Sequence, residues 1–305
     1  MESYFAELVD KSKPLMISKL TKLSALTPAN LDLFCASWGE IPTERRQDVV
    51  GHLITLAEGD PDLDFDDLFL IGIHDPDETV REKSIDGLWE YERSPLIDPL
   101  IKILRRDPCE PVRAAAITAL GKFALLSEFG KLRPKDEDKV VEALLEVTRN
   151  YNEEIDIRRR AVEAISSLSV PVVVETISEA YSSKDGRMKI SAIYAMGMNS
   201  DPAWLPILIK EMASPDPELR FEAARACGEI EDAQAVPQLL KLIRDPDTQV
   251  RIAAIDALGK IGGEDAEAAL QECAKHAEEY VRDAAADALR ELYFNRDPFS
   301  TETFE

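Results

Sequence analysis

The chain has 305 residues, of which 45% are hydrophobic and 31% are charged. This composition is typical of a folded, soluble protein and excludes a largely disordered chain. The formal net charge of −23 argues against binding to DNA, RNA or an anionic membrane surface, because such binding needs Lys and Arg side chains that neutralise phosphates.

Three segments near the N-terminus have helical patterns. Residues 27–38 open on a Thr-Pro pair, which is typical of an N-cap followed by a first helical turn. Residues 43–59 form a second such segment, and residues 64–74 are expected to be the first helix of a repeat. We interpret residues 1–74 as an N-terminal helical cap with degenerate repeats that covers the end of the core. A separate small domain is the alternative.

From residue 80 onward a nine-residue phrase returns seven times. Its clearest copy is VRIAAIDAL at 250–258, and every copy has a basic residue in second place. The basic residues are Arg81, Arg113, Arg158, Lys189, Arg220, Arg251 and Arg282. As differences of these numbers, the steps are 32, 45, 31, 31, 31 and 31 residues. A nearly fixed period in this range indicates a stacked-repeat architecture.

Each repeat has the pattern of two helices joined by a turn. In the sixth repeat, 232–243 and 248–261 carry apolar residues at helical spacing, and DPDTQ at 245–249 separates them. Asp and Pro in such a turn end one helix and cap the next. The sequence therefore predicts an all-α fold, an α-α superhelix over 75–294, with 295–305 as a frayed tail.

An acidic residue stands four positions before the basic residue in six of the seven copies. These acidic residues are Asp77, Glu154, Asp185, Asp216, Asp247 and Glu278. At the start of a second helix, they are expected to accept backbone N–H bonds and to favour the helix dipole. They are also expected to meet the basic residue of an adjacent repeat. We interpret the two columns as a structural charge ladder; the second repeat departs from it with Cys109.

The 45-residue step exceeds the usual 31 by 14 residues, and the additional residues lie near 122–138. Insertions in repeat proteins map to one face and often serve binding. Apolar side chains such as Phe123 and Phe129 also have enough area to dock back onto the stack. Packing and partner recognition are both hypotheses for this insertion.

The phrase and its turn carry a family resemblance. The segment DPDTQVRIAAIDALGKIGG at 245–263 resembles the HEAT-like repeats of the phycobilisome-lyase type, and the resemblance covers about residues 75–290. It implies a right-handed α-solenoid whose second helices line a concave face. The family includes scaffolds, adaptors, chromophore lyase subunits and a di-iron hydroxylase, so the resemblance is specific for the fold and weak for function.

The sequence contains no strong signal for a catalytic or cofactor site. The three histidines, His52, His74 and His276, lie far apart and none is followed by Glu, whereas the hydroxylase uses repeated His-Glu pairs. A metal site usually needs several convergent ligands. The glycines of 259–265 follow a helix and fit a C-cap better than a phosphate loop. We predict no cofactor and no metal, and acidic neighbours dilute the basic cluster at 158–160.

Outward positions on the second helices point to a partner surface. Positions one, two and five residues after the basic residue are expected to face outward, and in the middle repeats several of these are apolar or aromatic. The candidate partner-binding residues, which we call the candidate strip, are Ile190, Tyr194, Met198, Phe221, Arg225 and Ile252. Aromatic, Met and Arg side chains are typical of interface centres. The alternative is that the next repeat covers these residues and that they only fill the groove.

Taken together, these features predict a non-catalytic scaffold or adaptor that holds a protein partner on the concave face. The alternative is an enzyme or enzyme subunit of the HEAT-containing type, phycobilin-lyase-like or metal-dependent-hydroxylase-like. The four cysteines form no CxxC pair, which suits a reducing cytoplasm. No signal peptide is expected, and the apolar stretches are too short to cross a bilayer. Neither the partner nor the oligomeric state follows from the sequence.

Overall fold

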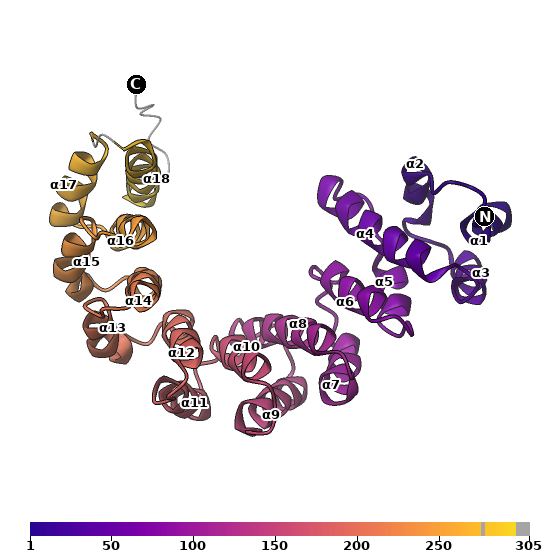
Figure 1. Ribbon diagram of the computed structural model, residues 1–305, viewed down its shortest axis with the longest axis horizontal. Helices are drawn as coiled ribbons and strands as arrows, with labels where there is room; N and C mark the ends of the chain where they lie inside the picture. The colour runs from indigo at the N-terminus through magenta and orange to yellow at the C-terminus, as the bar shows by residue number, and fades with distance from the viewer. Residues whose placement is uncertain (276–277, 297–305) are drawn as a thin grey trace. The chain divides into compact units, whose positions relative to one another are not determined.

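The computed structural model describes residues 1–275 and 278–296, and these residues form helices without any β-strand (Figure 1). Successive helices pair and stack, so the predicted all-α solenoid is confirmed. The chain forms two compact units, unit 1 at Met1–Leu144 and unit 2 at Leu145–Glu305. The boundary predicted after residue 74 lies within unit 1 and stays a prediction. The predicted tail at 295–305 lies outside the described residues from position 297 onward.

Unit 1 contains the three helices predicted near the N-terminus. Its elements are α1 (Glu2–Val9), α2 (Ile17–Leu20), η1 (Thr21–Leu23), α3 (Pro28–Trp38), α4 (Thr43–Gly59), α5 (Asp66–Gly72), α6 (Glu78–Gly87), η2 (Ser94–Leu96), α7 (Ile97–Arg106), α8 (Glu110–Glu128) and α9 (Pro134–Arg149), which continues into unit 2. Thr27 caps α3, because its hydroxyl accepts a hydrogen bond from the Asn30 N–H at 3.4 Å. Helices α1 and α2 were not assigned from the sequence.

Arginine–aspartate pairs join consecutive repeats in unit 1. Arg81 binds both carboxylate oxygens of Asp107, at 2.7 and 2.9 Å. Arg46 does the same with Asp75, whose Oδ1 lies 3.1 Å from the Arg46 Nη2 and whose Oδ2 lies 2.8 Å from its Nε. Asp75 also accepts a hydrogen bond from the indole N–H of Trp38 at 2.7 Å. Arg46 on α4 therefore makes the same kind of ion pair as the repeat arginine Arg81, although the nine-residue phrase is not evident in its helix.

The insertion of the long repeat is mostly helical. Helix α8 continues to Glu128, and α9 begins at Pro134 after a turn at Gly130. Phe123 and Leu126 are buried, whereas Leu125 and Phe129 are exposed. The insertion thus contributes to the core and also presents an apolar surface; its role in recognition stays a prediction.

Unit 2 is a regular double layer (Figure 1). Its elements are α10 (Ile155–Ile165), α11 (Pro171–Tyr181), α12 (Gly186–Asn199), η3 (Pro202–Trp204), α13 (Leu205–Glu211), α14 (Pro217–Ile230), η4 (Ala233–Ala235), α15 (Val236–Leu242), α16 (Thr248–Ile261), α17 (Glu264–Cys273) and α18 (Glu279–Arg296). The even-numbered helices α10 to α18 lie side by side and form the second-helix layer, and the odd-numbered helices pack behind them. The predicted helix at 248–261 is α16, whereas the one predicted at 232–243 opens as the 3-10 turn η4 before α15.

Very short side chains allow the second helices to touch. A Cβ atom added at Gly197 in α12 would lie 2.7 Å from the Cα of Ala226 in α14. The same relation recurs at the next two junctions, where a Cβ on Gly228 would lie 3.1 Å from the Ala257 Cα, and one on Gly259 3.0 Å from the Ala288 Cα. Real Cβ atoms essentially never approach other heavy atoms closer than 3.0 Å. Consecutive second helices therefore pack backbone against backbone.

The acidic column caps the second helices. The carboxylates of Asp77, Asp185, Asp216 and Asp247 each accept a hydrogen bond from a backbone N–H in the first turn. Glu154 and Cys109 occupy the same cap position without a side-chain hydrogen bond. At one junction the acidic residue also meets the preceding repeat, because the Arg251 Nη2 lies 2.9 Å from Glu278.

The charge ladder needs correction at its other junctions. Arg81 and Arg220 bind the Asp that precedes the next basic residue by six positions, not by four. Lys189 binds Glu211 of α13 at 3.0 Å. Arg113 donates to the carbonyls of its own turn, and Arg158 donates to the Thr148 carbonyl.

Candidate functional site

The candidate strip lies on three neighbouring helices of the second-helix layer in unit 2. Ile190, Tyr194 and Met198 are on α12, Phe221 and Arg225 on α14, and Ile252 on α16. Met198 and Arg225 are exposed, whereas the other four side chains are half-buried. Half-burial is compatible with both an interface and groove filling, so the partner-binding role stays a prediction.

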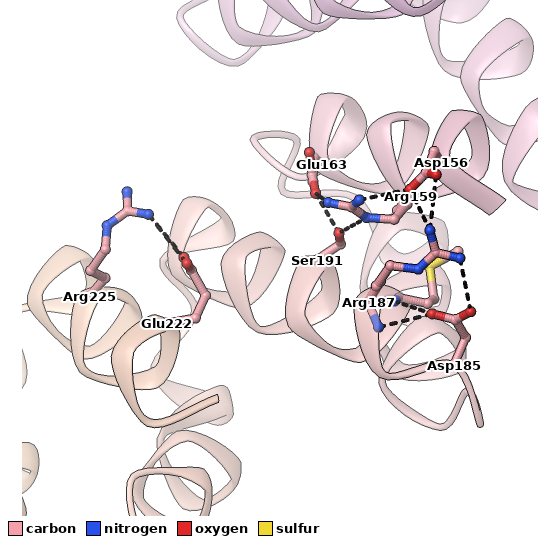
Figure 2. A network of polar contacts seen from close by, with 9 residues as sticks. Asp156, Arg159, Glu163, Asp185, Arg187, Ser191, Glu222 and Arg225 are labelled. Atoms are coloured by element: carbon pink, nitrogen blue, oxygen red, sulfur yellow. Dashed lines mark hydrogen bonds and ion pairs between the residues drawn. The ribbon is translucent and has the colours of Figure 1, made fainter. Parts of the chain in front are cut away.

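Arg225 contacts two other residues of the candidate strip. Its guanidinium carbon lies 5.8 Å from the ring centroid of Tyr194 and 5.9 Å from that of Phe221. Contacts of this kind contribute about 0.5–1 kcal/mol each at exposed sites. The Arg225 Nη1 also lies 3.1 Å from a carboxylate oxygen of Glu222, one helical turn earlier (Figure 2). The structure therefore brings Tyr194, Phe221 and Arg225 together.

Ile252 joins this group through a groove between α14, α16 and α18. The groove has a volume of about 460 Å³. Phe221, Arg225 and Ile252 line it together with small residues such as Ala253 and Ala257. Ile190, Tyr194 and Met198 do not line this groove, so the six predicted residues do not form one pocket.

In the three middle repeats the position two residues after the basic one is buried, which contradicts the outward orientation predicted there. Ser191 is 1% exposed and Glu222 is 9% exposed, whereas Arg160 at the same position of an earlier repeat is exposed. An adjacent second helix covers the position in α12, α14 and α16 because these helices approach so closely. Sequence reasoning therefore missed Glu222, although it is the one acidic residue at this position among the seven repeats, which is a visible signal.

A polar network on α10 and α12 lies beside the candidate strip. The Arg159 Nε donates to the Ser191 hydroxyl at 2.9 Å, and Ser191 in turn donates to Glu163 (Figure 2). Arg159 also binds Asp156 at 2.9 Å, and Asp156 accepts from Arg187 at 3.0 Å. Within the basic cluster at 158–160, Arg159 is thus paired with carboxylates, and Arg158 stacks over the Tyr151 ring at 4.4 Å.

The pKa values of Glu222 and Tyr194 are both raised. Burial raises the pKa of the Glu222 carboxyl, and Glu163 acts in the same direction, while Arg225 opposes them. Burial also raises the pKa of the Tyr194 hydroxyl, again with help from Glu163. The ionised form of Glu222 is unfavourable because the side chain is buried and near Glu163. A cation close to it would stabilise this ionised form.

Replacing Glu222 with Gln is expected to stabilise the protein at neutral pH. A carboxyl whose pKa is raised on folding contributes stability that is fully present below the ordinary Glu pKa and is lost as the pH rises through the folded-state pKa. The stability difference between E222Q and the natural chain should therefore grow with pH over this window. Urea titrations at several pH values would measure it, with Glu229→Gln on the same helix as the matched control. A difference that does not vary with pH would contradict the assignment.

Two aromatic residues of unit 1 are strongly exposed, and of these Trp89 was missed, whereas Phe129 belongs to the predicted insertion. Trp89 is 63% exposed and Phe129 is 68% exposed, and Lys122 donates a hydrogen bond to the Trp89 carbonyl. Trp89 stands eight residues after Arg81, where Gly occurs in four of the other repeats. A tryptophan cannot make the close helix contact that Gly allows, so α6 ends at Gly87 and Trp89 turns out to solvent. The break in the glycine column was the available signal.

Within the described ranges, no group of three or more His, Cys, Asp or Glu side chains is arranged to hold a metal ion. His52 is half-buried on α4 and His74 is exposed, while His276 lies outside the described residues. No described helix is both long and apolar enough to cross a membrane. The four cysteines are free thiols.

Paired helices, caps and a recurring basic residue in the second helices define an α-solenoid repeat protein. A family model of HEAT repeats matches residues 67–150 and 205–290, which together are more than half of the chain. The chain therefore belongs to the HEAT-repeat family. No curated protein matches it significantly in sequence.

Solved structures of similar fold support this assignment. The CpcE–CpcF complex of phycocyanin lyase from Nostoc sp. PCC7120 has a TM-score of 0.55 at 20% identity, over 77% of this chain and 90% of that chain. Kap95p, solved with RanGDP, has a TM-score of 0.56 at 13% identity, over 96% of this chain and 46% of that chain. Human deoxyhypusine hydroxylase reaches a TM-score of only 0.37 at 19% identity, over 90% of this chain and 98% of that chain. At these identities the first two structures show the fold of this chain alone.

Proposed function

We propose that this protein is a non-catalytic scaffold or adaptor that binds a protein partner on the second-helix layer of unit 2. One observation carries the proposal. Phe221, Arg225 and Ile252, from two successive repeats, line one groove of about 460 Å³. Full burial of a large apolar side chain contributes roughly 1.5–3 kcal/mol, so a few such anchors suffice for micromolar binding.

Two structural relatives are consistent with this role. CpcE and CpcF form a complex with each other, and Kap95p binds RanGDP. Their low sequence identity transfers no partner to this chain. The cytoplasmic location expected from cysteine usage remains part of the proposal.

The test is a double substitution, Phe221→Glu with Ile252→Glu. Partners captured by the full chain from a lysate of the source cells would be identified by mass spectrometry, and the strongest would be purified and titrated. Two buried carboxylates and two lost anchors are expected to weaken binding at least about 100-fold, with far-UV circular dichroism unchanged. Ile209→Glu with Leu240→Glu, half-buried residues on the first-helix layer, is the matched control and should keep full affinity.

If the double variant unfolds, the two residues belong to the core and the proposed surface is wrong. Unchanged affinity in a folded double variant would reject the proposal as well. The enzyme alternative predicts a different observation, namely iron or a visible chromophore that remains bound to the protein through purification.

A further inference from the structure

The groove between α14, α16 and α18 carries an unbalanced negative charge. Five charged residues line it: Arg225, Glu229, Asp256, Lys260 and Glu291. Both basic members are engaged inside the protein. Arg225 binds Glu222, and the Lys260 Nζ lies 2.8 Å from a carboxylate oxygen of Glu229. In the described part of the chain, no basic side chain forms an ion pair with Asp256 or Glu291.

Asp256 is one of the two groove carboxylates without an ion-pair partner in the described part of the chain. It stands on α16, one helical turn from Ile252 and one turn from Lys260. Partial burial raises the pKa of the Asp256 carboxyl, and the Glu291 and Asp287 carboxylates of α18 act in the same direction, while Lys260 opposes them. A second cation placed between Asp256 and Glu291 would remove this repulsion.

Apolar side chains line the groove beside the charged ones. Phe221 and Ile252 are half-buried, and each lies one helical turn before a charged lining residue, Arg225 on α14 and Asp256 on α16. The volume of about 460 Å³ falls within the range of ~300–1,000 Å³ that is usual for ligand pockets. Apolar side chains next to two unpaired carboxylates match a ligand side chain with an apolar stem and a cationic head.

We propose that this groove binds an arginine of a partner protein together with the aliphatic residue next to it. This inference rests on the proposed function and assigns the chemistry of the partner. Arginine fits better than lysine, because its planar guanidinium stacks on an aromatic ring such as Phe221 and donates two parallel hydrogen bonds to a carboxylate such as Asp256. The net charge of −23 also attracts a basic partner over long range.

The test follows the Ile252 methyl group by NMR in the full chain, labelled with ¹³C at the isoleucine δ1 methyls. The probe is N-acetyl-leucyl-arginine amide, and N-acetyl-leucyl-glutamine amide serves as its neutral counterpart. The arginine probe is expected to shift the Ile252 signal saturably, with a dissociation constant at least about tenfold below that of the neutral probe. The lysine version should lie between them.

Two sets of variants complete the experiment. Asp256→Asn with Glu291→Gln should weaken binding of the arginine probe about tenfold and leave binding of the neutral probe unchanged. Asp265→Asn with Glu272→Gln removes the same charge from exposed sites on α17 and should change neither. Equal affinity for both probes, or no effect of the first pair of substitutions, would overturn the proposal.

Other occupants give distinct results. A shift of the Ile252 signal on raising the protein concentration alone would show that a second copy of the chain fills the groove, and it would overturn the arginine assignment. If the arginine probe does not bind but Phe221→Glu with Ile252→Glu still abolishes partner capture, this inference fails while the proposed function stands. If the arginine probe does not bind and the Phe221→Glu with Ile252→Glu variant keeps its partner, both this inference and the proposed function are wrong.

Discussion

Replacing Arg220 with Ala is expected to lower the free energy of unfolding by about 3 kcal/mol. The Arg220 Nε and Nη2 both donate to Asp245 at 2.8 Å, and the two side chains are only 12% and 6% exposed. The substitution would leave the Asp245 carboxylate buried with its main partner removed, which is the costly way to break such a pair. Urea denaturation followed by far-UV circular dichroism would measure the loss.

An exposed pair in the same unit is the matched control. Lys260 and Glu229 also join consecutive second helices, but their side chains are 33% and 38% exposed. Lys260→Met is expected to cost less than about 1 kcal/mol, as is usual for surface ion pairs. If both substitutions cost the same, the Arg220–Asp245 pair is not the structural link we infer.

The Arg220–Asp245 pair also predicts a pH dependence. Burial opposes the effect, but the Arg220 hydrogen bonds hold the pKa of Asp245 below its ordinary value. A carboxyl with a depressed pKa contributes stability that is present above the ordinary Asp pKa and is lost as the pH falls through the folded-state pKa. The cost of Arg220→Ala should accordingly shrink in that acidic range.

Replacing Gly197 with Ala is expected to destabilise unit 2 by about 1–3 kcal/mol, although Ala is the better helix former by about 1 kcal/mol. The added Cβ would lie 2.7 Å from the Cα of Ala226, and a backbone atom cannot move aside without shifting all of α14. Gly186→Ala in the same helix is the control, since nothing lies within 4 Å of its added Cβ. Its stability should be unchanged or slightly higher.

Thermal and urea denaturation of both glycine variants would measure these effects. Because repeat arrays can unfold in parts, the slope of the transition should be compared as well as its midpoint. A Gly197→Ala variant as stable as the natural chain would mean that α12 and α14 separate easily.

The regular part of the fold was predictable because each repeat encodes its own helices. Periodicity and the Asp-Pro turn placed α16 at its observed bounds. The partners of the repeat arginines were not predictable, since they depend on the offset between stacked repeats, which no local pattern records. The same applies to Arg46, whose helix lacks the phrase but binds Asp75 in the same way.

The candidate strip was predictable as a set of positions but not as a site. Helical spacing placed Phe221 and Ile252 on one face, whereas the groove they share depends on the packing of α18 as well. Glu222 was missed because the burial of its position follows from the close helix contact rather than from helical periodicity. The sequence could not show that Asp256 and Glu291 are unpaired, because this depends on Arg225 and Lys260 pairing with other carboxylates of the protein.

The glycine contacts also govern the geometry of the array. In the second-helix layer, the spacing from α12 to α18 is set by main-chain atoms, whereas in the other layer larger side chains such as Leu208 and Leu239 lie in the core. A layer with a shorter interval per repeat must form the inner side of a bend in unit 2. Gly197, Gly228 and Gly259 thus set the local curvature of unit 2. A larger side chain at any of these positions would push two second helices apart, reduce the curvature and change the shape of the inner surface.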